Sequence, residues 1–398
     1  MEKLGSLFSA LLALVCLAGC DDGSSYDEPG GSGIRTANDI EVTAPGQLAS
    51  KLDAASYDLD SIAVYGPIGV EDFPALLRIG VYGNLRALNL KHARVEGGKI
   101  PDMAFSNVEG SHPFRVYNVI LPEGVTAIGE CAFAGSSVRH VELPQSLRTL
   151  GKDCFSQCDY MREIVIPAGV EEIPDECFKS CAILDRVVLP QSIKRIGDLA
   201  FRFSHVSDIN FPERLESVGK MAFSGSRIKR VELSHGLKLS DMIWTFENCF
   251  LIEDIVIADG VKDIPRFSDA RLVKSLDIPA SVEEIGSYTF QGCYMLTDLT
   301  LRDGLVSIGT NAFVSSPVQS LDIPSTVRSI GTKSFLIAEK AGKVTCRAIE
   351  PPLCDGSDAF VFADAALMST VPLYVPAGSE DLYRAAEGWS KFKNITAL

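Results

Sequence analysis

The chain contains 398 residues, of which 46% are hydrophobic and 22% charged, and it carries a formal net charge of -15. This much apolar material excludes a chain that is disordered throughout, and it is enough for a large core. The acidic balance disfavours a nucleic-acid partner, because the phosphate backbone requires a basic protein surface.

The first 20 residues have the features of a bacterial export signal. Lys3 precedes an apolar run from Leu4 to Ala18, which is too short to span a bilayer comfortably and ends in small residues. The ending Leu-Ala-Gly-Cys resembles the bacterial lipobox, and this resemblance implies that residues 1–19 are a cleaved signal peptide and that Cys20 is lipidated. The alternative is a plain secretory signal that happens to end in cysteine.

Residues 20–38 form the predicted tether, because the segment is rich in Gly, Ser and Asp and lacks hydrophobic periodicity. Asp21 and Asp22, directly after the cysteine, are similar to the surface-export signal of some Gram-negative lipoproteins. This resemblance implies an outer-membrane lipoprotein that is exposed on the cell surface and contacts the membrane through its lipid anchor alone.

One residue pattern recurs through the middle of the chain. Met161–Cys181 reads MREIVIPAGVEEIPDECFKSC, and Val138–Cys158 reads VRHVELPQSLRTLGKDCFSQC. Landmark prolines lie 22 or 23 residues apart, and a phenylalanine follows each one 11 residues later. These pairs are Pro122 and Phe133, Pro144 and Phe155, Pro167 and Phe178, Pro190 and Phe201, and Pro212 and Phe223. A fixed period of this length predicts a solenoid, because one copy cannot bury its apolar face alone whereas a stack can.

About ten such rungs span residues 116–338, and each rung has three parts. A short strand comes first and ends at the proline, which has no N–H for a sheet ladder. A returning segment follows, in which a glycine such as Gly197 is expected to permit a tight bend. An Ala-Phe or Cys-Phe turn closes the rung, with the phenylalanine filling the opposite wall of the core. Stacked strands then predict a parallel sheet with a spacing of about 4.8 Å.

Residues 39–115 are the predicted N-terminal cap, in which the repeat is degenerate. Apolar spacing predicts strands at Ser61–Tyr65 and Leu85–Leu90, and helices at Ala44–Ala55 and Asp72–Ile79. The first rung of a solenoid needs such a cap because its outer face must not invite further stacking.

Residues 339–398 are the predicted C-terminal cap. We expect a strand at Leu373–Pro376 and an amphipathic helix at Ser379–Glu387 that Ser379 opens, with acidic residues in its first turn. The apolar residues that would close the core behind this helix are Trp389, Phe392 and Ile395.

The consensus I-x-x-I-x-I-P-x-x-V-x-x-I-G-x-x-A-F-x-x-C resembles the BspA-like, or Treponema pallidum type, leucine-rich repeat family. The resemblance implies a repeat solenoid: a right-handed superhelix with a parallel β-sheet on one face and short turns or second strands on the other, closed by terminal caps. It also implies a bacterial surface protein, often a lipoprotein, that adheres to or binds a protein of a host, a matrix or a neighbouring cell.

Nine of the 11 cysteines lie beyond the signal and Cys20. In register with the repeat, six of them replace small residues, which favours buried free thiols that fill the core. They are Cys154 and Cys177 in an alanine position, and Cys158, Cys181, Cys249 and Cys293 in a serine position. The alternative is a disulfide between neighbouring rungs, such as Cys158 with Cys181, since a spacing of about 4.8 Å lies within the Cα separation that a disulfide allows.

The sequence contains no catalytic constellation. Its five histidines form no H-E-x-x-H motif, and neither a Gly-rich phosphate loop nor a G-x-S-x-G elbow occurs. We therefore expect a protein that is not an enzyme and that has no cofactor and no metal site.

The exposed strand positions are the predicted binding face, because a solenoid aligns equivalent residues into columns. These columns contain no aromatic residue, so a polar protein contact or a merely solvated sheet fits them better than glycan stacking, which usually needs Trp or Tyr. The candidate residues are His140, Glu142, Glu163, Arg186, Asp208, Asn210, Arg230, Glu232, Asp254, Asp277, Asp298 and Asp322.

The repeat is irregular between Ser234 and Ala270, where the landmark proline is lost twice and Trp244 and Phe250 occur. A local departure from a repeat can mark a functional contact, and tolerated drift is the alternative. The sequence thus favours non-enzymatic binding or adhesion to a protein partner. The second hypothesis is a surface-glycan capture component of a nutrient-uptake system.

Overall fold

The computed structural model describes residues 38–106, 113–239, 244–337, 342–356 and 358–398. The predicted signal peptide, Cys20 and nearly all of the predicted tether lie outside these ranges. Within them, no helix has both the length and the apolar character needed to cross a membrane.

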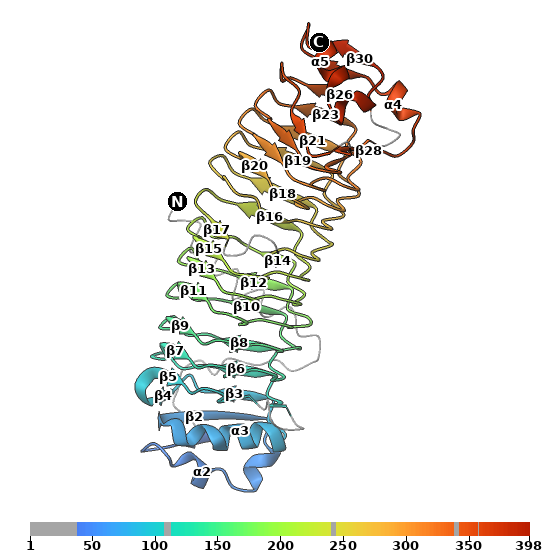
Figure 1. Ribbon diagram of the computed structural model, residues 1–398. Helices are drawn as coiled ribbons and strands as arrows, with labels where there is room; N and C mark the ends of the chain where they lie inside the picture. The colour runs from blue at the N-terminus through green and yellow to red at the C-terminus, as the bar shows by residue number, and fades with distance from the viewer. Residues whose placement is uncertain (1–37, 107–112, 240–243, 338–341, 357) are drawn as a thin grey trace, which may run out of the picture. The chain divides into compact units, whose positions relative to one another are not determined.

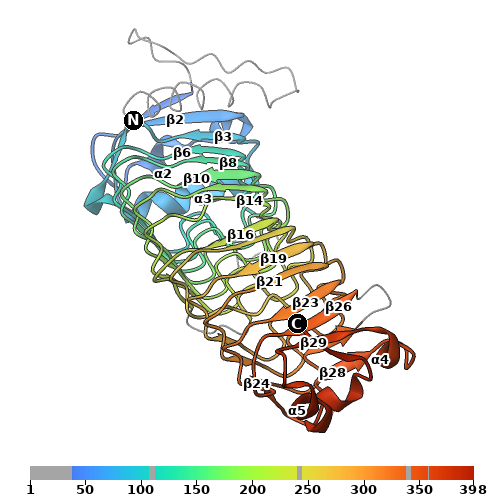
Figure 2. The same cartoon turned by 90° about the horizontal axis from the view of Figure 1, so that it is seen from above.

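Each rung contributes one short strand to a main parallel sheet, and Figures 1 and 2 show these strands in successive layers. The paired groups are β1-β2-β3-β6-β8, β10-β12-β14, β16-β18, β19-β21 and β23-β26-β29-β30. The strands are β1 (Asp39–Glu41), β2 (Ser61–Ile68), β3 (Ala87–Asn89), β6 (Asn118–Ile120), β8 (His140–Glu142), β10 (Glu163–Val165), β12 (Arg186–Val188), β14 (Asp208–Ile209), β16 (Arg230–Leu233), β18 (Asp254–Ile257), β19 (Ser275–Ile278), β21 (Asp298–Leu301), β23 (Ser320–Ile323), β26 (Lys343–Cys346), β29 (Leu373–Val375) and β30 (Ile395–Ala397). Glu163 pairs with Arg186, so one sequence repeat advances the chain by one strand.

The returning segments form a second set of parallel ladders of two-residue strands, grouped as β5-β7-β9, β11-β13-β15-β17 and β20-β22-β24-β27. The strands are β5 (Lys99–Ile100), β7 (Ala127–Ile128), β9 (Thr149–Leu150), β11 (Glu172–Ile173), β13 (Arg195–Ile196), β15 (Ser217–Val218), β17 (Lys238–Leu239), β20 (Glu284–Ile285), β22 (Ser307–Ile308), β24 (Ser329–Ile330) and β27 (Leu353–Cys354). The predicted leucine-rich repeat solenoid, with second strands opposite the main sheet, is confirmed.

A continuous stack of phenylalanine rings forms the third wall of the core. Neighbouring rings such as Phe155 and Phe178 lie 5.6 Å apart with an interplanar angle of 2°, and both side chains are fully buried. The stack runs through Phe105, Phe133, Phe155, Phe178, Phe201, Phe223, Phe246, Phe267, Phe290, Phe313, Phe335 and Phe360. Each buried ring contributes about 1.5–3 kcal/mol of hydrophobic stabilisation, and each stacked pair about 0.5–1.5 kcal/mol more.

The phenylalanine turns depend on residues in the left-handed backbone region. Asp153 and Gln157, which flank Phe155, have φ angles of 55° and 57°. The N–H groups of all three residues donate to carbonyl oxygens of the next rung at 2.8–3.1 Å. These hydrogen bonds offset a backbone conformation that costs a non-glycine residue about 1–3 kcal/mol.

The recurrent glycine of the returning segment has a different role from the expected one. Neither Gly151 nor Gly197 has a positive φ, so the prediction of a glycine-dependent bend is wrong. A Cβ atom on Gly151 would lie 2.4 Å from the carbonyl carbon of Gly129 and 2.5 Å from the nitrogen of Glu130. At Gly151 and Gly197 glycine is needed because the backbone of the preceding rung approaches too closely for a side chain.

The N-terminal region contains β2 and β3 where strands were expected, and α3 (Phe73–Tyr82) where a helix was expected. The helix expected at Ala44–Ala55 is wrong, because only α2 (Leu48–Lys51) forms there. Gly46 has a φ of 82°, which is not helical, so the helix begins only after it. The Asp53 carboxylate accepts hydrogen bonds from the N–H and the hydroxyl of Ser56, and a separate 3-10 turn begins there.

The C-terminal region has β29 at the expected strand and α5 (Glu380–Ala385) within the expected helix. Ser379 makes no side-chain cap; instead, the Glu380 carboxylate accepts the N–H of Gly378 at 2.8 Å. Trp389 is fully buried, and its indole N–H donates to the Pro352 carbonyl at 2.9 Å. The other elements here are β25 (Phe335–Ile337), β28 (Phe360–Phe362) and α4 (Leu367–Thr370).

Candidate functional site

The predicted binding face lies on the outer surface of the main sheet. Inward residues such as Ile164 are buried, and the residues on either side of them face solvent. Exposed members are His140, Glu142, Asp208, Asn210, Arg230, Glu232, Asp277 and Asp298, and half-buried members are Glu163, Arg186, Asp254 and Asp322. The sheet therefore brings all twelve side chains to one face.

The Asn210 side chain forms hydrogen bonds with the backbone of the neighbouring rung. Its amide oxygen accepts the N–H of Leu189 at 2.9 Å, and its amide nitrogen donates to the Leu189 carbonyl at 2.8 Å. The side chain thus continues the sheet ladder where β14 ends at Ile209, which leaves it with little capacity for a partner.

Ion pairs engage most of the charged side chains on this face, and most of these pairs join neighbouring rungs. Arg186 lies 3.9 Å from Glu163 and 3.4 Å from Asp208, and Arg230 pairs with Glu232 and Asp254. The side chains are 42–70% exposed, so solvent screens each pair, and the pairs chiefly fix side-chain positions.

Two arginines near the C-terminal rungs make bidentate pairs. Arg302 binds Asp277 at 2.9 and 2.6 Å, and Arg347 binds Asp322 with the same distances. The Arg302 hydrogen bond lowers the pKa of the Asp277 carboxyl. A shallow hollow of about 470 Å³ lies between these pairs and is also lined by Asp303. Because both guanidinium groups are already engaged, this hollow offers no unpaired positive charge to a ligand.

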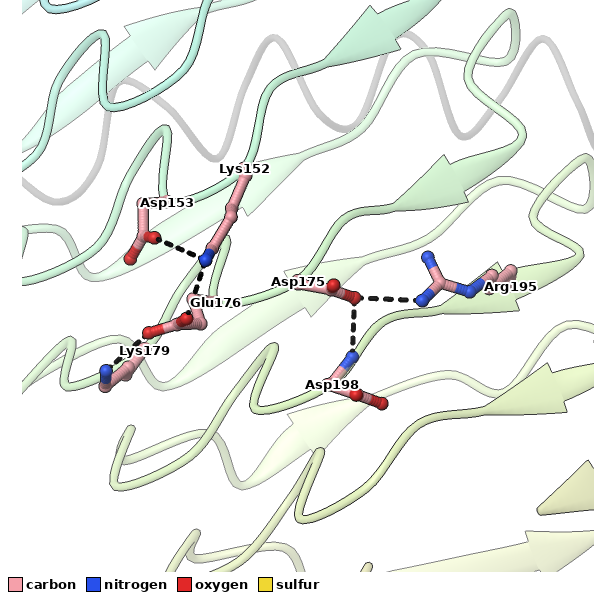
Figure 3. Close-up of polar contacts among 7 residues, drawn as sticks. All are labelled: Lys152, Asp153, Asp175, Glu176, Lys179, Arg195 and Asp198. Atoms are coloured by element: carbon pink, nitrogen blue, oxygen red, sulfur yellow. Dashed lines mark hydrogen bonds and ion pairs between the residues drawn. The ribbon is translucent and has the colours of Figure 1, made fainter. Parts of the chain in front are cut away.

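Another group of charged residues joins the second strands to the phenylalanine turns (Figure 3). Asp175 accepts from the Arg195 guanidinium at 2.9 Å and from the backbone N–H of Asp198 at 2.8 Å. Lys179 lies beside Glu176, and its hydrogen bond lowers the pKa of the Glu176 carboxyl. The Asp175 contacts connect neighbouring rungs and the Glu176 contact holds one turn, so the group has a structural role.

No reactive group stands out in this cluster. Lys152 lies 3.2 Å from Glu176 and 4.0 Å from Asp153. Burial raises the pKa of the Asp153 carboxyl, and the nearby Glu176 raises it further. Among the residues that the structure describes, no group of three or more His, Cys, Asp or Glu side chains could hold a metal ion.

The cysteines of the described residues are all free thiols, and the disulfide considered for Cys158 and Cys181 does not form. Cys154 and Cys177 are fully buried, with their sulfur atoms 3.5 Å apart. Burial raises the pKa of the Cys158 thiol to about 12 and that of Cys177 well above its usual range. Seven of the thiols are buried, namely the six that were expected to fill the core and Cys346.

Exposed aromatic side chains gather on the turn edge, which the strand columns did not reveal. Phe250 and Tyr294 are 39% and 55% exposed, and the Arg271 guanidinium lies between them, 4.4 Å and 5.9 Å from the two ring centroids. Leu251 and Met295 beside them are also exposed. We call these five residues the turn-edge patch. The sequence does place Phe250, Arg271 and Tyr294 at one repeat position, four residues after a core phenylalanine. This repeat position could have revealed the patch.

Of the two residues predicted at the irregular rung, Phe250 belongs to the turn-edge patch. Trp244 is 36% exposed and directly follows residues outside the described ranges. The adjacent Thr245 is buried, and Phe246 keeps its place in the ring stack. The irregular rung thus preserves the core while it presents large apolar side chains outward.

Comparisons with known proteins agree with this architecture. The model of the BspA type leucine rich repeat region matches residues 88–205, 171–268 and 266–349. A leucine-rich repeat protein from Bacteroides ovatus is 21% identical, with a TM-score of 0.52, and the alignment covers 86% of this chain and 88% of that one.

A leucine rich cell surface protein from Faecalibacterium prausnitzii is also 21% identical, with a TM-score of 0.43 and coverage of 75% and 82%. None of the curated proteins compared with the chain matches it. The family model matches well over half of the sequence, so the chain belongs to the BspA-type leucine-rich repeat family.

Proposed function

We propose that this protein is a non-enzymatic surface lipoprotein, anchored through Cys20 in the outer membrane, that binds or adheres to another protein. Membership of the family supports a binding role in general, since its repeats form a scaffold. The lipobox-like ending at Cys20 and the acidic residues after it support the anchor and the outward display.

The observation that carries the binding proposal is the turn-edge patch. Aromatic residues, Met and Arg are the residue types enriched at the centres of protein interfaces, and here they lie together on neighbouring rungs. Arg271 stacked between Phe250 and Tyr294 holds the three side chains in place before a partner arrives. Such order lowers the entropy cost of binding.

The test measures adhesion of the purified protein to a panel of immobilised host and matrix proteins. Replacing Phe250 and Tyr294 together with Ala should weaken binding of any partner found by at least about tenfold, as for interface residues of this kind. Tyr160→Ala is the matched control, because Tyr160 is 52% exposed on the turn edge of a distant rung.

If the double variant binds every such partner as well as the parent protein, the turn-edge proposal is wrong; equal binding by Trp244→Ala would separately reject a contact at the irregular rung. Protease treatment of intact cells checks the outward display separately. Loss of the protein from treated cells is expected, and its full survival would contradict a surface location.

Surface-glycan capture is the second candidate, and exposed aromatic rings favour it. The strand columns lack aromatic residues, but the turn edge presents Phe250, Tyr288 and Tyr294 to solvent. Aromatic faces suit sugar rings, which have an apolar side. A neutral-glycan array with the same variants separates the candidates, because only glycan capture predicts binding there.

A further inference from the structure

The residues directly before the main strands form a column on the N-terminal rungs. The N–H of Tyr117 donates to the Arg86 carbonyl at 2.8 Å, and the N–H of Arg139 donates to the Tyr117 carbonyl at 2.8 Å. Arg162 holds the equivalent position before β10. We call Arg86, Tyr117, Arg139 and Arg162 the arginine ladder.

Tyr117 positions two of these arginines. The guanidinium carbon of Arg139 lies 4.1 Å from the Tyr117 ring centroid, and that of Arg86 lies 5.0 Å from it. Stacking uses the flat face of a guanidinium and leaves the N–H donors at its edge available. The ladder therefore presents ordered hydrogen-bond donors that carry positive charge.

The arginines of the ladder differ from those further along the sheet. Arg186, Arg230, Arg302 and Arg347 each pair with a carboxylate. Within the described part of the chain, no carboxylate pairs with any arginine of the ladder. In a protein with a formal net charge of -15, these three cations are left for an external anion.

The ladder is bounded in its own column by Asp60 beside Arg86 and by Asp185 beside Arg162, and the column next to it contains a single carboxylate. Over the same four rungs the next column contains Ala87, Asn118, His140 and Glu163, and Glu163 lies 3.9 Å from Arg186. Four rungs at a spacing of about 4.8 Å give a positive strip about 14 Å long. The strip is one side chain wide, because each rung contributes one residue to it.

We propose that the arginine ladder binds a linear acidic polysaccharide that carries carboxylate or sulfate groups. A chain that runs across the rungs would meet one guanidinium group at three of four successive levels, and each can bind an anionic group through paired N–H donors. A protein partner fits less well, because the ladder has no exposed apolar anchor and arginines cover the Tyr117 ring. The ladder is separate from the turn-edge patch, so the two proposals stand or fall independently.

The experiment measures binding of the full protein to heparin as the sulfated probe, polygalacturonate as the carboxylated probe and dextran as the neutral probe. We expect binding to at least one anionic polymer and none to dextran. Arg139→Ala should weaken this binding about tenfold, and the triple variant R86A/R139A/R162A should abolish it. Which anionic probe binds identifies the charged group.

Arg214→Ala is the control, because Arg214 is exposed on another rung and its loss changes the net charge equally. It should bind like the parent protein, with all variants retaining the parent melting temperature. The proposal is overturned if neither anionic polymer binds, if the triple variant still binds, or if Arg214→Ala is as damaging as Arg139→Ala. If polyglutamate binds as tightly as the anionic polysaccharides and the triple variant loses this binding, the partner would instead be an acidic protein.

Discussion

The third residue after each core phenylalanine shows how a small side chain can hold neighbouring rungs together. The Cys158 thiol donates to the Phe133 carbonyl at 3.2 Å, and the Cys249 thiol donates to the Phe223 carbonyl at 3.0 Å. In another rung the Ser316 hydroxyl donates to the Phe290 carbonyl at 2.9 Å. Cysteine and serine interchange here because both are small and can donate, a role beyond the expected filling of space, although Ala270 fills the same position without a donor.

These buried thiols should make stability depend on alkaline pH. Burial raises the pKa of Cys158 to about 12 and that of Cys249 to about 11, above the value of about 8.5 for an exposed thiol. Between these values the unfolded chain loses the thiol proton and the folded chain keeps it. The contribution to the free energy of unfolding is therefore complete below about pH 8.5 and falls as the pH rises.

Urea unfolding at about pH 8 and about pH 10 measures this dependence. Replacing Cys158 and Cys249 with Ser should preserve the fold and make the loss of unfolding free energy about 4 kcal/mol smaller than in the parent protein. Lysine and tyrosine titration affects both proteins alike and cancels in the comparison. An equal loss of unfolding free energy in the parent protein and the variant would show that Cys158 and Cys249 ionise as readily in the folded protein as in the unfolded chain.

At the scale of the element, the second strands depend on contact between backbones. A Cβ atom on Gly309 would lie 2.5 Å from the nitrogen of Ser287, whereas a Cβ atom on Gly286 would meet nothing closer than the Thr289 hydroxyl at 3.4 Å. Both glycines follow an isoleucine in the same repeat position and neither has a positive φ. They therefore form a matched pair.

Gly309→Ala should lower the free energy of unfolding by about 1–3 kcal/mol or more, because the rungs must separate to admit the methyl group. Gly286→Ala should change it by less than about 0.5 kcal/mol. Chemical denaturation of the two variants beside the parent protein measures both effects. Equal stability of the two variants would contradict the backbone-contact explanation.

At the scale of the described solenoid, each rung rests on its two neighbours, so whole rungs should be removable. Deleting residues 186–207 joins Asp185 to Asp208 and should place β10 beside β14, since Arg186 and Asp208 occupy the same register. Stability in such arrays is close to a sum of rung and interface contributions.

The shortened protein should fold cooperatively, with an unchanged circular dichroism spectrum per residue and a length about 4.8 Å smaller by small-angle scattering. Deleting residues 186–196 is the control. It removes β12 and β13 but keeps the following phenylalanine turn, so the register is lost and the protein should aggregate. Comparable folding of both deletions would refute the rung as the structural unit.

The spacing of Pro167 and Phe178, copied along the chain, determined the solenoid, the inward strand residues and the small-residue positions of the cysteines. A repeat specifies these features because every copy occupies the same environment and its apolar residues can be buried only by stacking. The same spacing also placed the candidate sheet residues on one face, since side chains alternate along a strand.

Only the tertiary structure decided which surface residues are free to bind. Arg139 and Arg186 lie in adjacent columns of the repeat and both are predicted to be exposed, yet Arg186 pairs with carboxylates of neighbouring rungs whereas Arg139 stacks on Tyr117. The patch of Phe250, Arg271 and Tyr294 likewise arises from residues that are more than 20 positions apart. Such contacts depend on distances between rungs and on side-chain direction at the turns, and the pattern within one repeat contains neither.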